Sequence, residues 1–251
     1  IHILDLTQTL DLTKIALEKI FKTIENNGKI LFVSTKKQAS EAIAEVAKET
    51  DQYFVNYRWL GGMLTNWGTI SNSIKKLKKL ETDLVSENRG FTKKELLKMS
   101  VKKDKLQRSL GGISEMKKIP DLVFIIDTNY ESLAIQESVK LGIPIIAILD
   151  SNSNPDGIDF PIPGNDDAMR SITLYCELAQ TAVLDGLQAE LMASGTDIGS
   201  AEVAPEEPTL AEASAEATDA QPADEAPSEI AQSDAAEETT TDKDATEQAS
   251  T

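Results

Sequence analysis

The sequence has very few of the side chains that enzymes use for nucleophilic or metal chemistry. Cys176 is its only cysteine and His2 its only histidine in 251 residues. One cysteine excludes an intrachain disulfide framework and fits a reducing compartment. No CxxC or HxxxH pair supports a zinc site, and a Ser–His or Cys–His pair would have to use His2. We therefore predict a structural His2, a buried and unreactive Cys176, and no cofactor.

Glycine-rich phosphate loops and long apolar runs are also missing. Neither GxxxxGK[ST] nor GxGxxG occurs, which argues against both standard nucleotide sites. The apolar runs 30–33 and 143–149 are too short to span a bilayer, and the first residues lack the basic start and apolar core of a secretory signal. The sequence also has no initiating Met, and we expect truncation or processing at its start. We predict neither a membrane partner nor a small-molecule substrate.

Charge is distributed unevenly along this acidic chain, whose net charge is −17. Residues 1–187 carry 24 Lys and Arg against 25 Asp and Glu, whereas residues 188–251 carry one Lys and 17 acidic residues. From about Thr196 onward there is no aromatic residue, so the segment cannot bury enough apolar area to offset its ordering entropy. We predict a disordered acidic tail over 188–251, which either solvates the protein or binds a basic partner.

Short apolar runs alternate with helical patterns along most of the chain. Strands are predicted at 28–35, 52–56, 120–127, 143–150 and 159–162, the last at an edge. Helices are predicted from Thr7 or Thr9 to Asn26, and at 36–49, 131–141 and 166–187. Strands that are apolar on both faces and alternate with helices form parallel sheets covered on both sides. We therefore predict a doubly wound parallel α/β domain made of 1–57 and 119–187.

Residues 58–118 interrupt this alternation and form the one strongly basic region, with 15 Lys and Arg against six Asp and Glu. Helical patterns at 66–86 and 92–110 predict an antiparallel coiled-coil hairpin. In the first helix, four lysines lie roughly opposite an apolar stripe of Ile70, Ile74, Leu77, Leu80 and Leu84. The second helix adds further lysines without balancing acids. The lysines indicate either a solvated charged surface or a polyanion partner.

Three smaller patterns leave alternatives open. The predicted junction 34–37 is either an ordinary helix start or a phosphate site built from backbone N–H groups and two lysines. Asp127 and Asp150 end two predicted strands, where carboxylates act in catalysis or Mg²⁺ binding but more commonly cap a loop or helix. Both tryptophans lie within 58–67, where they either stack on splayed bases or sugars or anchor the hairpin, and we favour an anchor for at least one.

Five segments together resemble the bacterial-type small-subunit ribosomal protein two family. They are FVNYRWLGGMLTNW (54–67), SLGG (109–112), PDLVFIID (120–127), LGIP (141–144) and IPGNDDA (162–168). They occur in the family's order, and the resemblance covers about Ile3 to Leu187. Family members usually begin with an additional segment ahead of Ile1, so we expect isolated RNA binding to be weaker here than in the whole protein.

The resemblance implies an α/β domain with a protruding coiled-coil hairpin and no catalytic activity. It implies assembly into the small ribosomal subunit, in the cytoplasm or in an organelle. There the family contacts ribosomal RNA at the head–body junction and helps dock ribosomal protein one. Together with the patterns above, it makes the following residues candidates for RNA contact: Lys36, Lys37, Arg58, Trp59, Asn66, Trp67, Lys75, Lys76, Lys78, Lys79, Lys102 and Lys103.

Two other classes of function remain as alternatives to the ribosomal one. A phosphate-handling hydrolase would use Asp127 and Asp150, and its metal-dependent turnover would be lost in Asp127→Asn. A protein-binding module would grip a partner helix with its hairpin, and that binding would persist at high salt without RNA.

Overall fold

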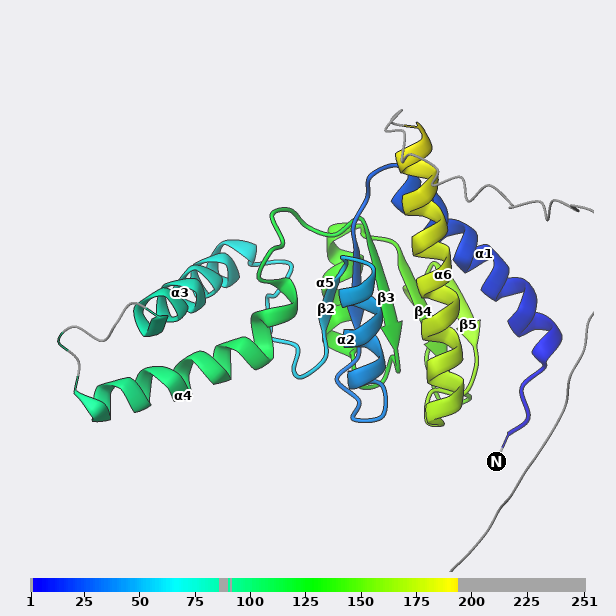
Figure 1. The fold of residues 1–251 in the computed structure, drawn as a ribbon. Helices are drawn as coiled ribbons and strands as arrows, with labels where there is room; N and C mark the ends of the chain where they lie inside the picture. Colours follow the sequence, from blue (N-terminus) through cyan, green and yellow to red (C-terminus); the bar gives the residue numbers. More distant parts are fainter. Residues whose placement is uncertain (1, 86–89, 91, 194–251) are drawn as a thin grey trace, which may run out of the picture. The chain divides into compact units, whose positions relative to one another are not determined.

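The computed structural model describes residues 2–85, 90 and 92–193, which belong to one compact unit. Its five strands form one parallel sheet in the order β2-β1-β3-β4-β5 (Figure 1). The strands are β1 (Ile30–Val33), β2 (Tyr53–Val55), β3 (Leu122–Ile126), β4 (Ile145–Leu149) and β5 (Phe160–Pro163). The chain adds β2 on one side of β1 and the other strands on the opposite side, so the predicted doubly wound parallel sheet is confirmed.

The sheet is buried on both faces because its three inner strands are apolar throughout. Every residue of β1, β3 and β4 is buried, and the rings of Phe32 and Phe124 lie 5.4 Å apart on neighbouring strands. The strand β5 contains Pro161 and Pro163, which an edge strand tolerates because one side needs no ladder hydrogen bonds. The expected edge strand therefore exists, one residue later than predicted.

Helices α1 (Leu6–Glu25), α2 (Ser40–Glu49) and α6 (Met169–Ala193) share a core with one face of the sheet. Asp5 caps α1 by accepting a hydrogen bond from the Thr7 N–H, so α1 begins before the predicted threonine caps. Helix α6 continues to Ala193, beyond the predicted end at residue 187. Residues 188–193 of the predicted tail are therefore helical, and the rest of that tail lies outside the described residues.

The other face of the sheet packs against α5 (Ser132–Leu141) and the start of the basic insertion. The insertion contains α3 (Trp67–Val85), α4 (Lys93–Leu110) and the short 3₁₀ helix η1 (Gly111–Ile113). Helices α3 and α4 pack side by side in Figure 1. In the predicted apolar stripe of α3, Ile70, Ile74 and Leu77 are buried, and Leu80 and Leu84 are half-buried. Thr92 and Glu95 form a capping box at the start of α4. The coiled-coil character of the pair and the division into three domains stay predictions.

None of the helices in the described part of the chain is both long enough and apolar enough to cross a membrane.

Candidate nucleic-acid interface

Exposed lysines on the two hairpin helices outnumber the acidic residues of these helices. The buried stripe of Ile70, Ile74 and Leu77 faces inward on α3. The other side of this helix therefore faces solvent, and it carries the exposed Lys75, Lys76, Lys78 and Lys79. Lys76 lies close enough to Lys102 of α4 that its hydrogen bonding and its charge lower the pKa of the Lys102 ammonium. Two like charges held together on an exposed surface repel each other until an anion neutralises them.

Few of the insertion's cations are neutralised by neighbouring acids. Within 58–85 and 92–118, ion pairs engage Lys78, 2.9 Å from Glu115, and Lys118, 3.0 Å from Asp121. Lys103 is half-buried on α4, and Arg58 is exposed where the chain enters the hairpin. The exposed lysines of α3 and α4 thus form a basic surface with spare positive charge.

The segment between β2 and α3 is fastened to the domain by one buried carboxylate. Glu137 of α5 is 9% exposed and accepts hydrogen bonds from Trp59 Nε1 at 3.0 Å and from the Gly62 N–H at 2.8 Å. It also accepts from the Leu64 N–H at 2.9 Å and from both the N–H and the hydroxyl of Thr65. Five donors on one carboxylate fix how the chain leaves the domain toward α3.

These donors also set the charge state of Glu137. Burial alone would raise its pKa, but the hydrogen bonds from Thr65, Trp59, Leu64 and Gly62 outweigh burial and hold the pKa below its ordinary value. The carboxylate is therefore ionised at neutral pH. Sequence reasoning missed this residue, although its place between Ala134 and Ser138 on the buried side of α5 was a usable signal.

The two tryptophans of this segment both pack against the domain. Trp59 is 7% exposed, and Trp67 is half-buried against the same apolar cluster. The anchor that we favoured for at least one tryptophan is therefore present, and Trp59 has little surface left for stacking on a base. Asn66 is exposed and accepts a hydrogen bond from the Thr69 hydroxyl at 3.0 Å, at the start of α3.

Lys36 lies inside an ion cluster instead of at a helix start. Its ammonium is 3.0 Å from Asp127, 3.3 Å from Asp166 and 2.6 Å from Asp167, and Lys36 is 7% exposed. Burial alone would lower its pKa, but the hydrogen bonds to Asp167 and Asp127 and the attraction of the carboxylates raise it. Helix α2 begins only at Ser40, so the predicted helix start at residue 36 is wrong. With three carboxylates on its ammonium, Lys36 is not part of the exposed basic surface.

The same cluster explains Asp127, one of the two aspartates considered for catalysis. Asp127 Oδ1 accepts the N–H groups of Asn129 and Tyr130, and its φ of 69° places it in the left-handed region that Asp tolerates in turns. Its other oxygen accepts from Lys36. Asp127 is thus a capping and ion-pairing residue, as the commoner alternative predicted.

These groups line an acidic cavity at the carboxyl ends of β1, β3 and β4. The acidic cavity is bounded by Lys36, Asp127, Tyr130, Asp150, Asp166 and Asp167, among others. Burial and repulsion from Asp127 raise the pKa of the Asp166 carboxyl. Because its acids outnumber its one cation, this cavity repels phosphate. Lys37, in contrast, is exposed beside it and stays a candidate for RNA contact.

Cys176 fits the predicted unreactive thiol. It lies in α6 at 3% exposure, and burial, with a smaller contribution from the charge of Glu177, raises its pKa to about 12. Thiolate is the reactive form of cysteine, so this side chain is a packing residue at neutral pH.

Comparison with known proteins places the chain in one family. A model of the ribosomal protein S2 family matches residues 1–186. The chain is 57% identical over 213 residues to the small ribosomal subunit protein uS2 of Rhodospirillum centenum, covering 84% of this chain and 82% of that protein. The uS2 protein of Phenylobacterium zucineum is 59% identical, over 84% of this chain and 71% of its own length.

A third relative agrees. The uS2 protein of Sinorhizobium medicae is 55% identical, with 84% of this chain and 83% of that protein covered. The matched region contains the sheet, the basic insertion and the segment held by Glu137. Family models and relatives thus agree with the five segments that carried the resemblance, and the chain belongs to the ribosomal protein S2 family.

Proposed function

We propose that this chain is a structural constituent of the small ribosomal subunit and binds its ribosomal RNA through the exposed lysines of α3 and α4. The observation that carries this proposal is the set of exposed lysines on α3 and α4, where Lys78 pairs with Glu115 and few other acids lie nearby. The lowering of the Lys102 pKa by Lys76 supports it. A phosphate bound between the ammonium groups of Lys76 and Lys102 would remove the repulsion between them. A ribosomal protein need not be an enzyme, and its work is to hold RNA in place.

Phosphate contacts supply the affinity in this account. Each ammonium that neutralises a phosphate releases a condensed counterion, so binding weakens as salt rises, by roughly 0.7–0.9 units of log–log slope per contact. These contacts fix position more than they read sequence, because A-form RNA is recognised mainly by its shape and backbone. The anchored segment 59–65 adds rigidity, since a hairpin fixed by Glu137 presents its lysines without further ordering on binding.

The resemblance alone carries three finer parts of the proposal. The RNA contact lies at the head–body junction, the assembled protein helps dock ribosomal protein one, and the site of action is the ribosome of the cytoplasm or of an organelle. Neighbouring small-subunit proteins are further partners. The acidic cavity is a surface that RNA avoids, and it leaves room for a protein neighbour.

The proposal is tested by binding the full chain to purified small-subunit ribosomal RNA over a series of salt concentrations. We expect log affinity to fall linearly with log salt, and Lys76→Glu with Lys102→Glu to lower both the affinity and the slope. The matched control reverses the exposed Lys14 of α1 and Lys140 of α5, which changes total charge equally.

Equal losses in the two double variants would mean that only total charge matters, and would contradict a hairpin site. Binding that does not depend on salt would contradict the electrostatic account itself.

A further inference from the structure

A second cavity lies at the root of the hairpin, on the edge of the sheet formed by β2. This basic cavity has a volume of about 470 Å³ and is bounded by α2, the end of β2 and the junction of α4 with η1. Its lining includes Lys48, Phe54, Tyr57, Gln107 and Arg108, and none of its lining residues is acidic. Its size falls in the range of small-ligand sites, roughly 300–1,000 Å³.

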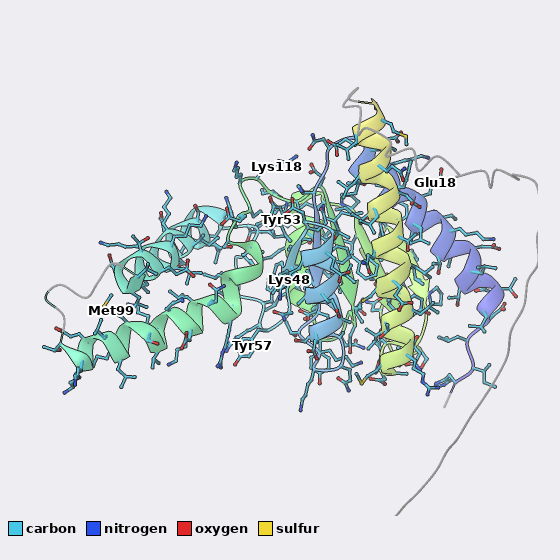
Figure 2. All side chains as sticks on the ribbon, in the orientation of Figure 1. Glu18, Lys48, Tyr53, Tyr57, Met99 and Lys118 are labelled. Carbon is cyan, nitrogen blue, oxygen red and sulfur yellow. The ribbon has the colours of Figure 1, made fainter. Side chains whose placement is uncertain are left out.

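The basic cavity combines exposed aromatic surface with positive charge. Tyr57 is 59% exposed, so its ring offers apolar surface on which a base can stack. Lys48 Nζ lies 5.8 Å from the centre of the Phe54 ring, a cation–π distance that holds the ammonium at the cavity wall. In Figure 2 the labelled Lys48 and Tyr57 lie between α2 and the base of α4.

The walls of the cavity are held by close backbone packing. A Cβ on Gly112 would lie 2.1 Å from the Phe54 carbonyl oxygen, so only glycine lets η1 approach β2 this closely. Asn56 Nδ2 donates to the Ser40 carbonyl at 3.1 Å and ties the chain after β2 to the start of α2. The cavity is thus formed before any ligand arrives.

The cavity also continues the basic surface of the hairpin. Lys98, Lys102, Lys105 and Arg108 follow one another at three- or four-residue spacing along α4, which places them along one side of the helix. Arg108 belongs to both this row and the cavity lining. An RNA strand that ran along this row of α4 toward the domain would reach Tyr57, which lines the same cavity as Arg108.

We propose that the basic cavity takes one unpaired nucleotide of ribosomal RNA. Its base stacks on the exposed Tyr57 ring, and Lys48 and Arg108 neutralise the flanking phosphates. Gln107 lines the same cavity and supplies an amide that can hydrogen-bond a base edge. Proteins commonly recognise single-stranded or bulged RNA by stacking splayed bases on aromatic and arginine side chains. This inference rests on the proposed RNA binding and adds the chemical class that one part of the surface selects.

The test uses the full chain and two short RNA hairpins. One contains a single bulged 2-aminopurine, a fluorescent base, and the other is the same hairpin fully paired. We expect the bulged RNA to bind roughly tenfold more tightly than the paired RNA, because stacking one base on an aromatic ring contributes about that much. The fluorescence of 2-aminopurine should fall on binding as the base stacks.

Three variants separate the cavity from general effects. Tyr57→Ala should abolish the preference for the bulged RNA and leave the affinity for paired RNA unchanged, whereas Tyr57→Phe should keep the preference. Tyr130→Ala removes the exposed tyrosine of the acidic cavity and should change neither affinity. Thermal unfolding of each variant shows whether the fold is retained. If Tyr57→Ala does not fold, the fall in 2-aminopurine fluorescence on binding the wild-type chain carries the test, and an unchanged fluorescence would contradict the nucleotide site.

The possible failures are distinguishable. If the wild-type chain binds both RNAs equally, or Tyr57→Ala weakens both equally, the nucleotide site is wrong while RNA binding by the hairpin stands. If the wild-type chain binds neither RNA, the proposed function and the nucleotide site are both wrong.

Discussion

The acidic and basic cavities each expose one tyrosine, but the charges around these tyrosines have opposite signs. In the acidic cavity Tyr130 stands near several aspartates, and Lys36 is already held by three of them. In the basic cavity Tyr57 stands near Lys48 and Arg108, with no acid in the lining. The first cavity is closed to phosphate by its charge, and the second attracts it.

The position of the two cavities gives this difference its meaning. Doubly wound sheets usually bind ligands at the carboxyl ends of their strands, at the point where the strand order reverses. Here that place lies between β1 and β3 and is filled by the Lys36 ion cluster. The basic groups lie instead on the insertion and, at Lys48, on α2. The customary site of a fold is thus no guide to phosphate binding when most of the charged groups that line it are acidic.

The largest effect is expected from removing the cation of the acidic cavity. Lys36→Ala leaves Asp127 and Asp166 buried without their counter-charge, so we expect a loss of about 3–5 kcal/mol of unfolding free energy. The neighbouring Lys37→Ala, at an exposed position, should change stability by less than about 0.5 kcal/mol. Urea unfolding measures the unfolding free energy of both variants. If Lys36→Ala lost as little as Lys37→Ala, Lys36 would not be the counter-charge that holds the acidic cavity together.

A second effect concerns the carboxylate that fastens the hairpin. Glu137→Gln places an amide against five donors, and we expect it to cost about 2–3 kcal/mol at neutral pH. The folded state holds the pKa of Glu137 below its ordinary value of 4.5, so its contribution is present above pH 4.5 and is lost as pH falls further.

The difference between wild type and Glu137→Gln should therefore shrink between pH 7 and about pH 3.5, as judged by urea unfolding at each pH. A difference that stays constant, or grows on acidification, would mean that Glu137 is not held as an anion.

A third effect is expected from changing the shape of the basic cavity without changing its charge. Gly112→Ala forces a methyl group against Phe54, so we expect about 1–3 kcal/mol of destabilisation and loss of the preference for bulged RNA. Gly61→Ala is the matched control, because a Cβ there meets nothing within 4 Å. Similar melting temperatures for the two variants would show that η1 can move away from β2 at little cost.

The smallest effect is expected at the edge of the basic surface. Lys78 is paired with the exposed Glu115, and such surface pairs contribute little to stability. Glu115→Gln frees the ammonium for phosphate, so the log–log salt slope of RNA binding should steepen by up to about one unit. Titration of the variant with RNA at several salt concentrations measures this slope. An unchanged slope would mean that Lys78 does not contact an RNA phosphate.

Local patterns in the sequence were sufficient for the sheet and the hairpin helices. The apolar runs around Phe32, Phe124 and Ile146 predict buried parallel strands, and the stripe through Ile74 predicts the inward side of α3. Element ends shifted by a few residues, because caps such as Asp5 lie outside the apolar pattern that places a helix.

The site was less predictable because its key contacts join residues far apart in the chain. Lys36 meets Asp127 and Asp166 only after the strands pair, so the sequence alone presented it as one lysine of a helix start. Glu137 binds a segment more than 70 residues earlier. The lysines of α3 were predictable, since the opposite apolar stripe already places them outward.

The most direct test of the account is sedimentation of the tagged chain with small ribosomal subunits through a sucrose gradient, at low and at high salt. We expect wild type and the Lys14→Glu, Lys140→Glu control to co-migrate with the subunits at low salt and to dissociate as salt rises. The Lys76→Glu, Lys102→Glu variant should migrate mostly as free protein at low salt. Undiminished co-migration of that variant would contradict the claim that the hairpin lysines hold the RNA.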